Sequence, residues 1–123
     1  MEIHERTHGD VVIVDFQGPL PTDDESSLVL RDTLRRVMDR GGKWILLNVA
    51  ELTYVDSVWL GAMVQAYASA ARRGGAVKLL HVRSRFRELL HVTKLDTVFD
   101  LFESEEEAEA SFTSSPVPPT PRK

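Results

Sequence analysis

Residues 44–61 read WILLNVAELTYVDSVWLG, a buried-strand pattern followed by the start of a helix. The first six residues, 44–49, form a nearly continuous apolar run, which is typical of a strand covered on both faces near the centre of a sheet. Asp56 and Ser57 then precede apolar residues at helical spacing, which indicates that a helix begins there. A central strand followed by a helix predicts an α/β fold.

Upstream of this stretch, the sequence predicts a hairpin and then a helix. An apolar, β-branched run at 11–16 follows a turn signal at 9–10 and a looser segment at 3–7, so the two segments predict paired strands. Residues 22–25, TDDE, match a capping box, and the glycine pair at 41–42 supplies a helix stop. A helix is therefore expected between the capping box and the glycine pair.

Downstream, strands and helices continue to alternate. After the helix that begins near Ser57, the patterns predict a strand at 76–81, a short helix starting near 84, a strand at 97–102 and a last helix from 104. The expected order is ββαβαβαβα. Because right-handed crossovers join parallel strands, we expect an α/β fold with a mostly parallel central sheet and helices packed against it.

The amino-acid composition indicates the extent of the folded domain and its cellular location. The chain has 123 residues without cysteine, and its 15 basic and 19 acidic residues give a net charge of −4. Four of the six prolines lie in residues 113–123, so we expect a folded domain at 1–112 and a disordered tail at 113–123. Residues 1–5 show no signal-peptide pattern, and a cytoplasmic location is expected.

Several classes of partner and chemistry are excluded at this point. The negative charge gives no basic footprint for nucleic acid, and no stretch approaches the ~20 apolar residues of a membrane span. No cofactor is indicated. His4 and His8 share one face of a strand, but no carboxylate of clear geometry accompanies them, so no metal site is expected. The sequence lacks a nucleophile elbow, a phosphate-binding glycine loop and a histidine in a triad relation to Ser57. The chain is therefore not expected to be an enzyme.

The segment 52–61 carries the most functional information, because it joins the end of a buried strand to a helix start. Ser57 there has two roles to choose between. It could cap the helix, since Asp and Ser are favoured caps. It could also accept a phosphate, because the helix N-terminus stabilises negative charge. On spacing alone, capping is the preferred interpretation.

The motifs taken together resemble the STAS domain family, and most closely its bacterial anti-sigma factor antagonists. The resemblance rests on the element order, the Gly-x-Leu at 18–20, the Asp-Ser-x-x-Leu-Gly at 56–61 and the Gly-Gly at 74–75. Residues 95–99 and 104–108 are similar to the usual end of the family. The resemblance thus covers nearly all of residues 2–112 and implies a STAS domain.

What the resemblance implies is partner switching. Unphosphorylated antagonists bind an anti-sigma factor that is also a serine kinase of the histidine-kinase-like ATPase type, which frees the sigma factor. The kinase then phosphorylates the antagonist, and a phosphatase resets it. Carried over to this sequence, the phosphoacceptor would be Ser57. The implied partner-binding residues are Leu20, Thr22, Asp23, Asp56, Val58, Trp59 and Gly61.

The sequence also supports a second hypothesis, a STAS scaffold or interaction module that is never phosphorylated and assembles with itself or with a larger signalling or transport complex. Its support is that Val58 replaces the second hydroxyl of the antagonists, Trp59 replaces a glycine, and Asn48 replaces a strand-end aspartate. Trp59 has two interpretations of its own. It either shields the edge of the core beside an apolar helix stripe or is an exposed anchor for a partner.

Overall fold

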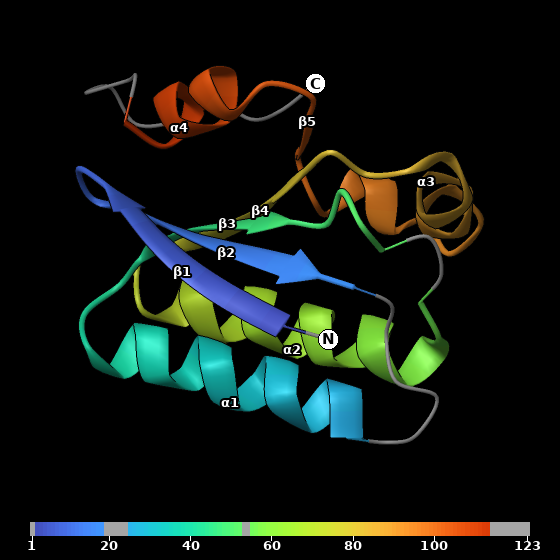
Figure 1. The fold of residues 1–123 in the computed structure, drawn as a ribbon, viewed down its shortest axis with the longest axis horizontal. Coiled ribbons are helices and arrows are strands. Elements are labelled where there is room, and N and C mark those ends of the chain that lie inside the picture. Colours follow the sequence, from blue (N-terminus) through green and yellow to red (C-terminus); the bar gives the residue numbers. More distant parts are fainter. Residues whose placement is uncertain (1, 19–24, 53–54, 114–123) are drawn as a thin grey trace.

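A five-stranded sheet with its strands in sequence order forms the middle layer of the molecule (Figure 1). The computed structural model describes residues 2–18, 25–52 and 55–113. The first two strands pair antiparallel as the expected hairpin, and every later pairing is parallel. The strands are β1 (Glu2–His8), β2 (Val11–Gln17), β3 (Trp44–Asn48), β4 (Ala76–Leu80) and β5 (Leu101–Phe102).

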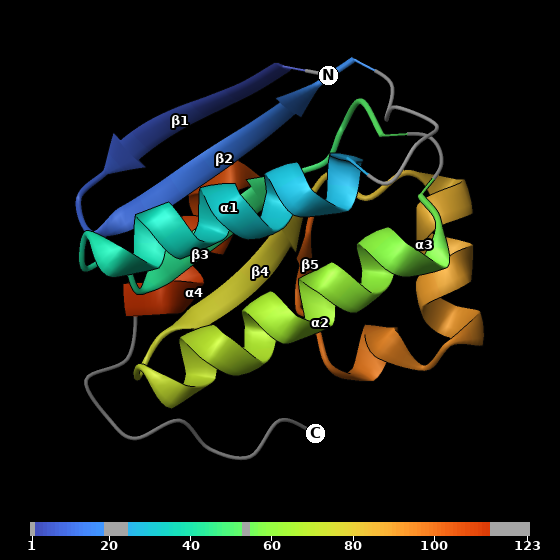
Figure 2. The same cartoon turned by 90° about the horizontal axis from the view of Figure 1, so that it is seen from below.

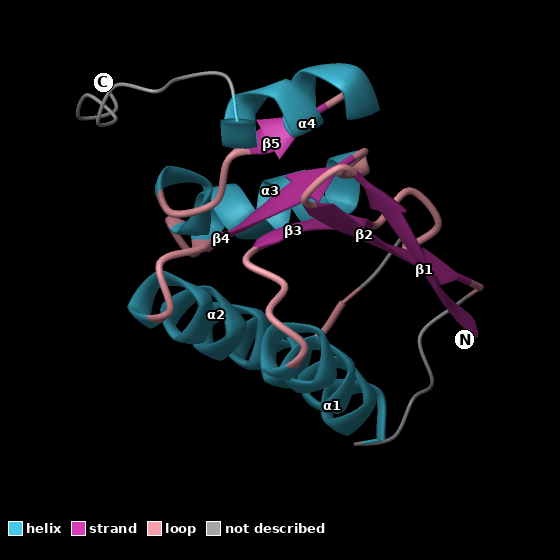
Figure 3. Ribbon diagram, turned by 90° about the vertical axis from the view of Figure 1, so that its left-hand side faces the viewer, coloured by secondary structure: helices cyan, strands magenta, loops and turns pink. Residues whose placement is uncertain are grey.

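Helices cover both faces of this sheet, as Figures 2 and 3 show. Two parallel helices, α1 and α2, lie on one face, α4 lies on the other, and α3 stands beside the N-terminal end of α2. Their bounds are α1 (Glu25–Asp39), α2 (Ser57–Arg72), α3 (Ser84–Val92) and α4 (Glu105–Thr113). The expected α/β architecture with a mostly parallel sheet is confirmed.

The two layers of helices explain why β3 is apolar at every central position. Ile45 and Leu47 are fully buried in the main core beneath α1, α2 and α3. Leu46 points to the opposite face and is equally buried, in a smaller core completed by Ala108 of α4. Burying such a side chain contributes about 1.5–3 kcal/mol, so β3 stabilises both layers at once.

A close backbone approach places the start of β4. Ala76 N donates a hydrogen bond of 2.8 Å to the carbonyl of Lys43, at the start of the neighbouring strand. A Cβ on Gly75 would lie 2.2 Å from that same carbonyl oxygen. The second glycine of the 74–75 pair is therefore required by packing, while Gly74, with φ +80°, turns the chain out of α2.

The expected strand at 97–102 is wrong over most of its length. The chain instead makes a short 3-10 helix, η1 (Leu95–Thr97), and only Leu101–Phe102 pair with β4. Val98 and Phe99 both donate back to the Leu95 carbonyl at 3.0 Å, which keeps the backbone coiled. Phe99 is apolar because it is buried in the core, where its ring packs edge-on against Tyr67.

Two of the expected features lie wholly or partly outside the described residues. The capping box begins at Thr22, whereas the described part of α1 begins at Glu25. Of the expected tail, residues 114–123 are not described. Among the described helices, none combines the length and the apolar character needed to cross a membrane.

Candidate functional site

The start of α2 follows directly from the loop after β3, and Asp56 caps it. Asp56 has extended backbone angles, and its Oδ1 accepts a hydrogen bond of 2.8 Å from Trp59 N. Its carbonyl accepts the first helical bond, from Leu60 N at 3.1 Å. This is the geometry of an N-cap residue. The preferred interpretation of Ser57 as the cap is therefore wrong, because the neighbouring aspartate performs that role.

Ser57 is the first residue of the helix, and its side chain is exposed. Within the described residues, its hydroxyl makes no hydrogen bond. The N–H groups in the first turn of a helix lack helical acceptors, and this end carries the positive side of the helix dipole. A free hydroxyl at this position is accessible for modification, and a phosphate there would be electrostatically stabilised.

Two further predicted partner-binding residues share this exposed surface with Ser57. Val58 is 53% exposed. Gly61 is also exposed, and a Cβ built on it would meet nothing within 4 Å. The structure therefore brings Asp56, Ser57, Val58 and Gly61 together at one end of α2. Leu20, Thr22 and Asp23 lie outside the described residues.

Trp59 departs from this group, because its side chain is 0% exposed. The indole packs edge-on against Phe16 at the end of β2 and Phe86 in α3, with ring centroids 5.6 and 6.3 Å away. Trp59 is thus a core residue, and the interpretation as an exposed partner anchor is wrong. Its Nε1 has no hydrogen-bond partner within the described part of the chain.

A partly buried polar network lies beside the ends of β2 and β3. Asp15 is only 8% exposed. Its carboxylate accepts bonds from Arg6 Nε at 2.6 Å, Arg6 Nη2 at 3.0 Å and Asn48 Nδ2 at 2.7 Å. Burial alone would raise the pKa of Asp15, but the hydrogen bonds from Arg6 and Asn48 outweigh it and hold that pKa below its ordinary value.

Asn48 has a structural role in this network that sequence reasoning did not find. While its amide nitrogen donates to Asp15, its Oδ1 accepts a bond of 3.1 Å from Ala50 N. It therefore fastens the beginning of the loop that leads to α2. An aspartate at position 48 would have no N–H to donate, so the replacement noted in the sequence fits the presence of Asp15.

The same arginine connects β1 to α4. Arg6 donates to both carboxylate oxygens of Glu105, at 3.1 and 3.0 Å. These hydrogen bonds are the main cause that lowers the pKa of Glu105, against an opposing effect of burial. Because Arg6 and Glu105 are 99 residues apart, only the fold brings them together.

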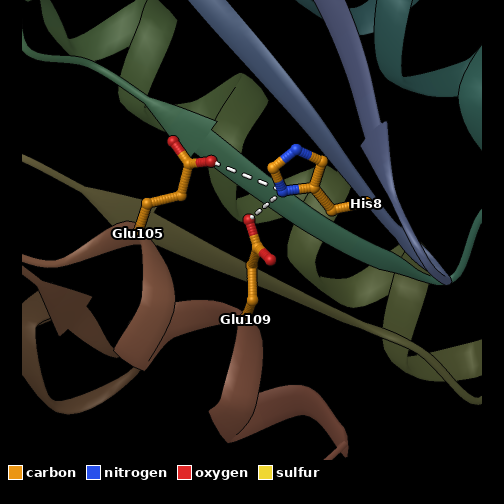
Figure 4. A group of neighbouring side chains, drawn as sticks. All are labelled: His8, Glu105 and Glu109. Carbon is orange, nitrogen blue, oxygen red and sulfur yellow. Dashed lines mark hydrogen bonds and ion pairs between the residues drawn. The ribbon is translucent and has the colours of Figure 1, made fainter.

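His8 extends this connection, as Figure 4 shows. Its Nδ1 lies 2.9 Å from Glu109 and 3.7 Å from Glu105. The sequence indicated no carboxylate near this histidine, and the structure supplies two from α4. Imidazole and carboxylate are chemically able to bind a transition metal, but both oxygens of Glu105 are already bonded to Arg6. We therefore interpret His8, Glu105 and Glu109 as a polar clasp between β1 and α4.

Comparison with known proteins places this geometry in context. The sequence profile of the STAS domain matches residues 2–108. The anti-sigma-B factor antagonist of Bacillus subtilis (strain 168) is 28% identical over 76 residues, which cover 62% of this chain and 69% of that protein. The chain is thus similar in sequence to an anti-sigma factor antagonist.

Solved structures share the fold at lower sequence identity. A protein from Thermotoga maritima superimposes with a TM-score of 0.80 at 21% identity, over 89% of this chain and 93% of the other. The unphosphorylated anti-sigma factor antagonist SpoIIAA gives 0.79 at 17% identity, over 93% and 98%. The phosphorylated form of Bacillus SpoIIAA gives 0.70 at 19%, over 89% and 98%. At these identities the likeness establishes the fold alone.

Proposed function

Because the chain belongs to the STAS domain family, we propose that it is an anti-sigma factor antagonist whose partner binding is switched by phosphorylation of Ser57. The observation that carries this proposal is the division of roles at the head of α2. Asp56 supplies the cap through its bond to Trp59 N, and this leaves the exposed Ser57 hydroxyl available to a kinase. The antagonist of Bacillus subtilis supports the choice of partner class.

The partner, and not this chain, would catalyse the transfer of phosphate to Ser57. Antagonists of this family are not enzymes, as the sequence predicts for this chain. The proposed partner is a cytoplasmic anti-sigma factor that is also a serine kinase of the histidine-kinase-like ATPase type, with a phosphatase to reset the switch. The proposed contact surface is Asp56, Ser57, Val58 and Gly61, with Leu20, Thr22 and Asp23 from the loop before α1.

One phosphate is physically sufficient to reverse such binding. It brings about −1.5 to −2 charges to Ser57. In the free protein, the N-terminus of α2 would stabilise that charge. In the complex, the dianion would lie between the Asp56 carboxylate and the apolar side chain of Val58, where a partner surface would strip it of water. Like-charge repulsion and desolvation both then favour release of the partner.

The test uses the anti-sigma factors with an ATPase-kinase domain that the source genome encodes. Each is purified, incubated with the full chain and ATP, and the chain is analysed by intact and peptide mass spectrometry. We expect one added phosphate on Ser57 and none on the Ser57→Ala variant. We also expect Ser57→Asp to bind the same partner at least tenfold more weakly than wild type. An unmodified Ser57, together with unchanged binding by Ser57→Asp, would rule the switch out.

The exposed side chain of Val58 favours a second candidate, a scaffold that binds without phosphorylation. An apolar residue at 53% exposure next to Ser57 is suited to a permanent contact, including one with a second copy of the chain. Light scattering across a concentration series distinguishes the two functions. A monomer at every concentration, with phosphate on Ser57 in protein from its native cell, excludes the scaffold.

A further inference from the structure

A groove between α1 and α2 lies on the outside of the molecule and begins one helical turn beyond Val58 of the Ser57 surface. We propose that this groove is a second part of the partner-binding surface and that it receives an acidic segment of the partner protein. The proposal rests on the proposed function. It adds that the partner contacts this groove through a segment that carries carboxylates.

The groove is formed because small residues of α2 face α1. The two helices run parallel along one face of the sheet (Figure 2), and both begin at the same end of the molecule. Ala62 and Ala66 of α2 leave a hollow of about 120 Å³ beside Leu34 and Met38 of α1, all four of which are buried. The remaining lining residues are Arg31, Arg35, Gln65, Ser69 and Arg73.

The charge of this groove is opposite to that of the chain. Three of its lining residues are arginines and none is acidic, although the net charge of the protein is −4. Arg73 is paired with Asp39 at 3.2 Å. Arg31 and Arg35 are exposed, and within the described residues neither takes part in a salt bridge. Because they are four positions apart, they lie on the same side of α1. Two arginines beside an apolar hollow are complementary to carboxylates on a partner.

Two exposed apolar side chains, one on each helix, precede the groove. Leu28 lies one turn before Arg31 on the same side of α1 and is 54% exposed. Val58 lies one turn before Ala62 on α2, is 53% exposed, and directly follows Ser57. A partner segment with apolar side chains over Leu28 and Val58, and carboxylates opposite the two arginines, fits this arrangement. A phosphate on Ser57 would stand at the head of the groove and repel that acidic segment.

A protein segment fits this surface better than nucleic acid does. Specific nucleic-acid binding relies on many Lys and Arg contacts to phosphates, whereas this groove offers two arginines without a salt-bridge partner in the described part of an acidic chain. Exposed apolar side chains at one end add nothing to phosphate binding but suit the buried centre of a protein interface.

The experiment reverses the charge of the groove and measures binding. The full-length Arg31→Glu/Arg35→Glu variant is compared with wild type by calorimetry at two salt concentrations, using the anti-sigma factor kinase that wild type binds. We expect the dissociation constant to rise at least tenfold and its dependence on salt to become weaker. The matched control, Arg36→Glu/Lys43→Glu, carries the same charge change outside the groove and should bind within about twofold of wild type.

The possible results distinguish failure of the groove proposal from failure of the proposed phosphorylation switch. If both charge variants bind as wild type does while Ser57→Asp does not, the groove proposal is wrong and the proposed function stands. If wild type binds none of the anti-sigma factor kinases, the proposed function fails and the groove proposal fails with it. Loss of self-association, or of binding to a DNA duplex probe, in the Arg31→Glu/Arg35→Glu variant alone would identify a second copy or nucleic acid as the occupant instead. The neutral variant Arg31→Gln/Arg35→Gln repeats the comparison if the glutamates disturb the fold.

Discussion

At the scale of single residues, the decisive feature is that Asp56 and Ser57 have different roles although both residue types are good helix caps. The Asp56 carboxylate is used by the backbone, at 2.8 Å from Trp59 N. A residue whose side chain stabilises the helix cannot change chemically without a cost in stability. Because Asp56 carries that role, Ser57 can gain or lose a phosphate while the helix remains capped.

This division predicts unequal effects of two alanine substitutions. Asp56→Ala removes the cap and should lower the free energy of unfolding by about 1 kcal/mol, within the 0.5–2 kcal/mol typical of N-caps. Ser57→Ala removes an exposed hydroxyl and should change it by less than about 0.5 kcal/mol. Urea unfolding followed by circular dichroism measures both. A loss in Ser57→Ala as large as that in Asp56→Ala would show that the serine is the cap after all.

The sequence left open whether Trp59 is a core residue or an exposed partner anchor, and its burial decides for the core. Its neighbours in the chain, Ser57 and Val58, are exposed, but a helix turns successive side chains by about 100°, so Trp59 points inward. There it contacts the ends of two other elements through Phe16 and Phe86. The tryptophan therefore fixes where the head of α2 lies relative to β2 and α3, and so positions the exposed residues beside it.

At the scale of elements, the network of Arg6, Asp15 and Glu105 joins β1, β2 and α4. In the folded state the pKa of Asp15 is lowered, and hydrogen bonds from Arg6 are the main cause that lowers the pKa of Glu105. A carboxylate with a lowered folded pKa contributes stability above its unfolded pKa. That contribution is lost as the pH falls through the folded value. The network is therefore expected to hold these elements together at neutral pH and to weaken in acid.

The acid dependence of stability gives a direct test. The free energy of unfolding of wild type should fall between about pH 5 and pH 2. Asp15→Asn, which cannot be protonated, should be less stable than wild type at pH 7 and should show a shallower fall in acid. Urea unfolding at a series of pH values measures this. Asp32→Asn, an exposed carboxylate of α1 without a salt bridge in the described part of the chain, is the control and should follow wild type. Parallel curves for wild type and Asp15→Asn would contradict the network's role.

The elements also show where sequence reasoning succeeds. The run from Trp44 to Asn48 predicted β3 correctly because a strand buried on both faces has to be apolar at successive positions. Val98 and Phe99 predicted a strand incorrectly, since apolar side chains are required by burial in any backbone conformation, and the bonds to Leu95 O coil this segment. The partners of Arg6 could not be predicted, because they are 9 and 99 residues away.

At the scale of the whole molecule, the two faces of the sheet carry different structural features. The face under α1 and α2 carries the larger core, the head of α2 and the groove that Arg31 and Arg35 line. The face under α4 carries the smaller core and the clasp of His8, Glu105 and Glu109. The sequence predicted that α2 begins near Ser57, but not this separation, because it depends on which helix returns to which side of the sheet.

The separation predicts that stability and binding can be changed independently. Phe112 of α4 packs against Trp44, with ring centroids 5.9 Å apart, and against the Lys78 ammonium, 4.7 Å from its ring. Phe112→Ala should therefore lower the free energy of unfolding by about 1–3 kcal/mol, less than for a fully buried phenylalanine. Its affinity for the proposed anti-sigma factor kinase should stay within about twofold of wild type, because the proposed contact surface lies on the opposite face.

Urea unfolding and calorimetry on the same protein preparations measure both effects, and Arg31→Glu/Arg35→Glu should give the reverse pattern, with nearly unchanged stability and weakened binding. If Phe112→Ala remains folded at the assay temperature and still loses tenfold in affinity, then α4 belongs to the binding surface. The partner would in that case have to contact both sides of the sheet.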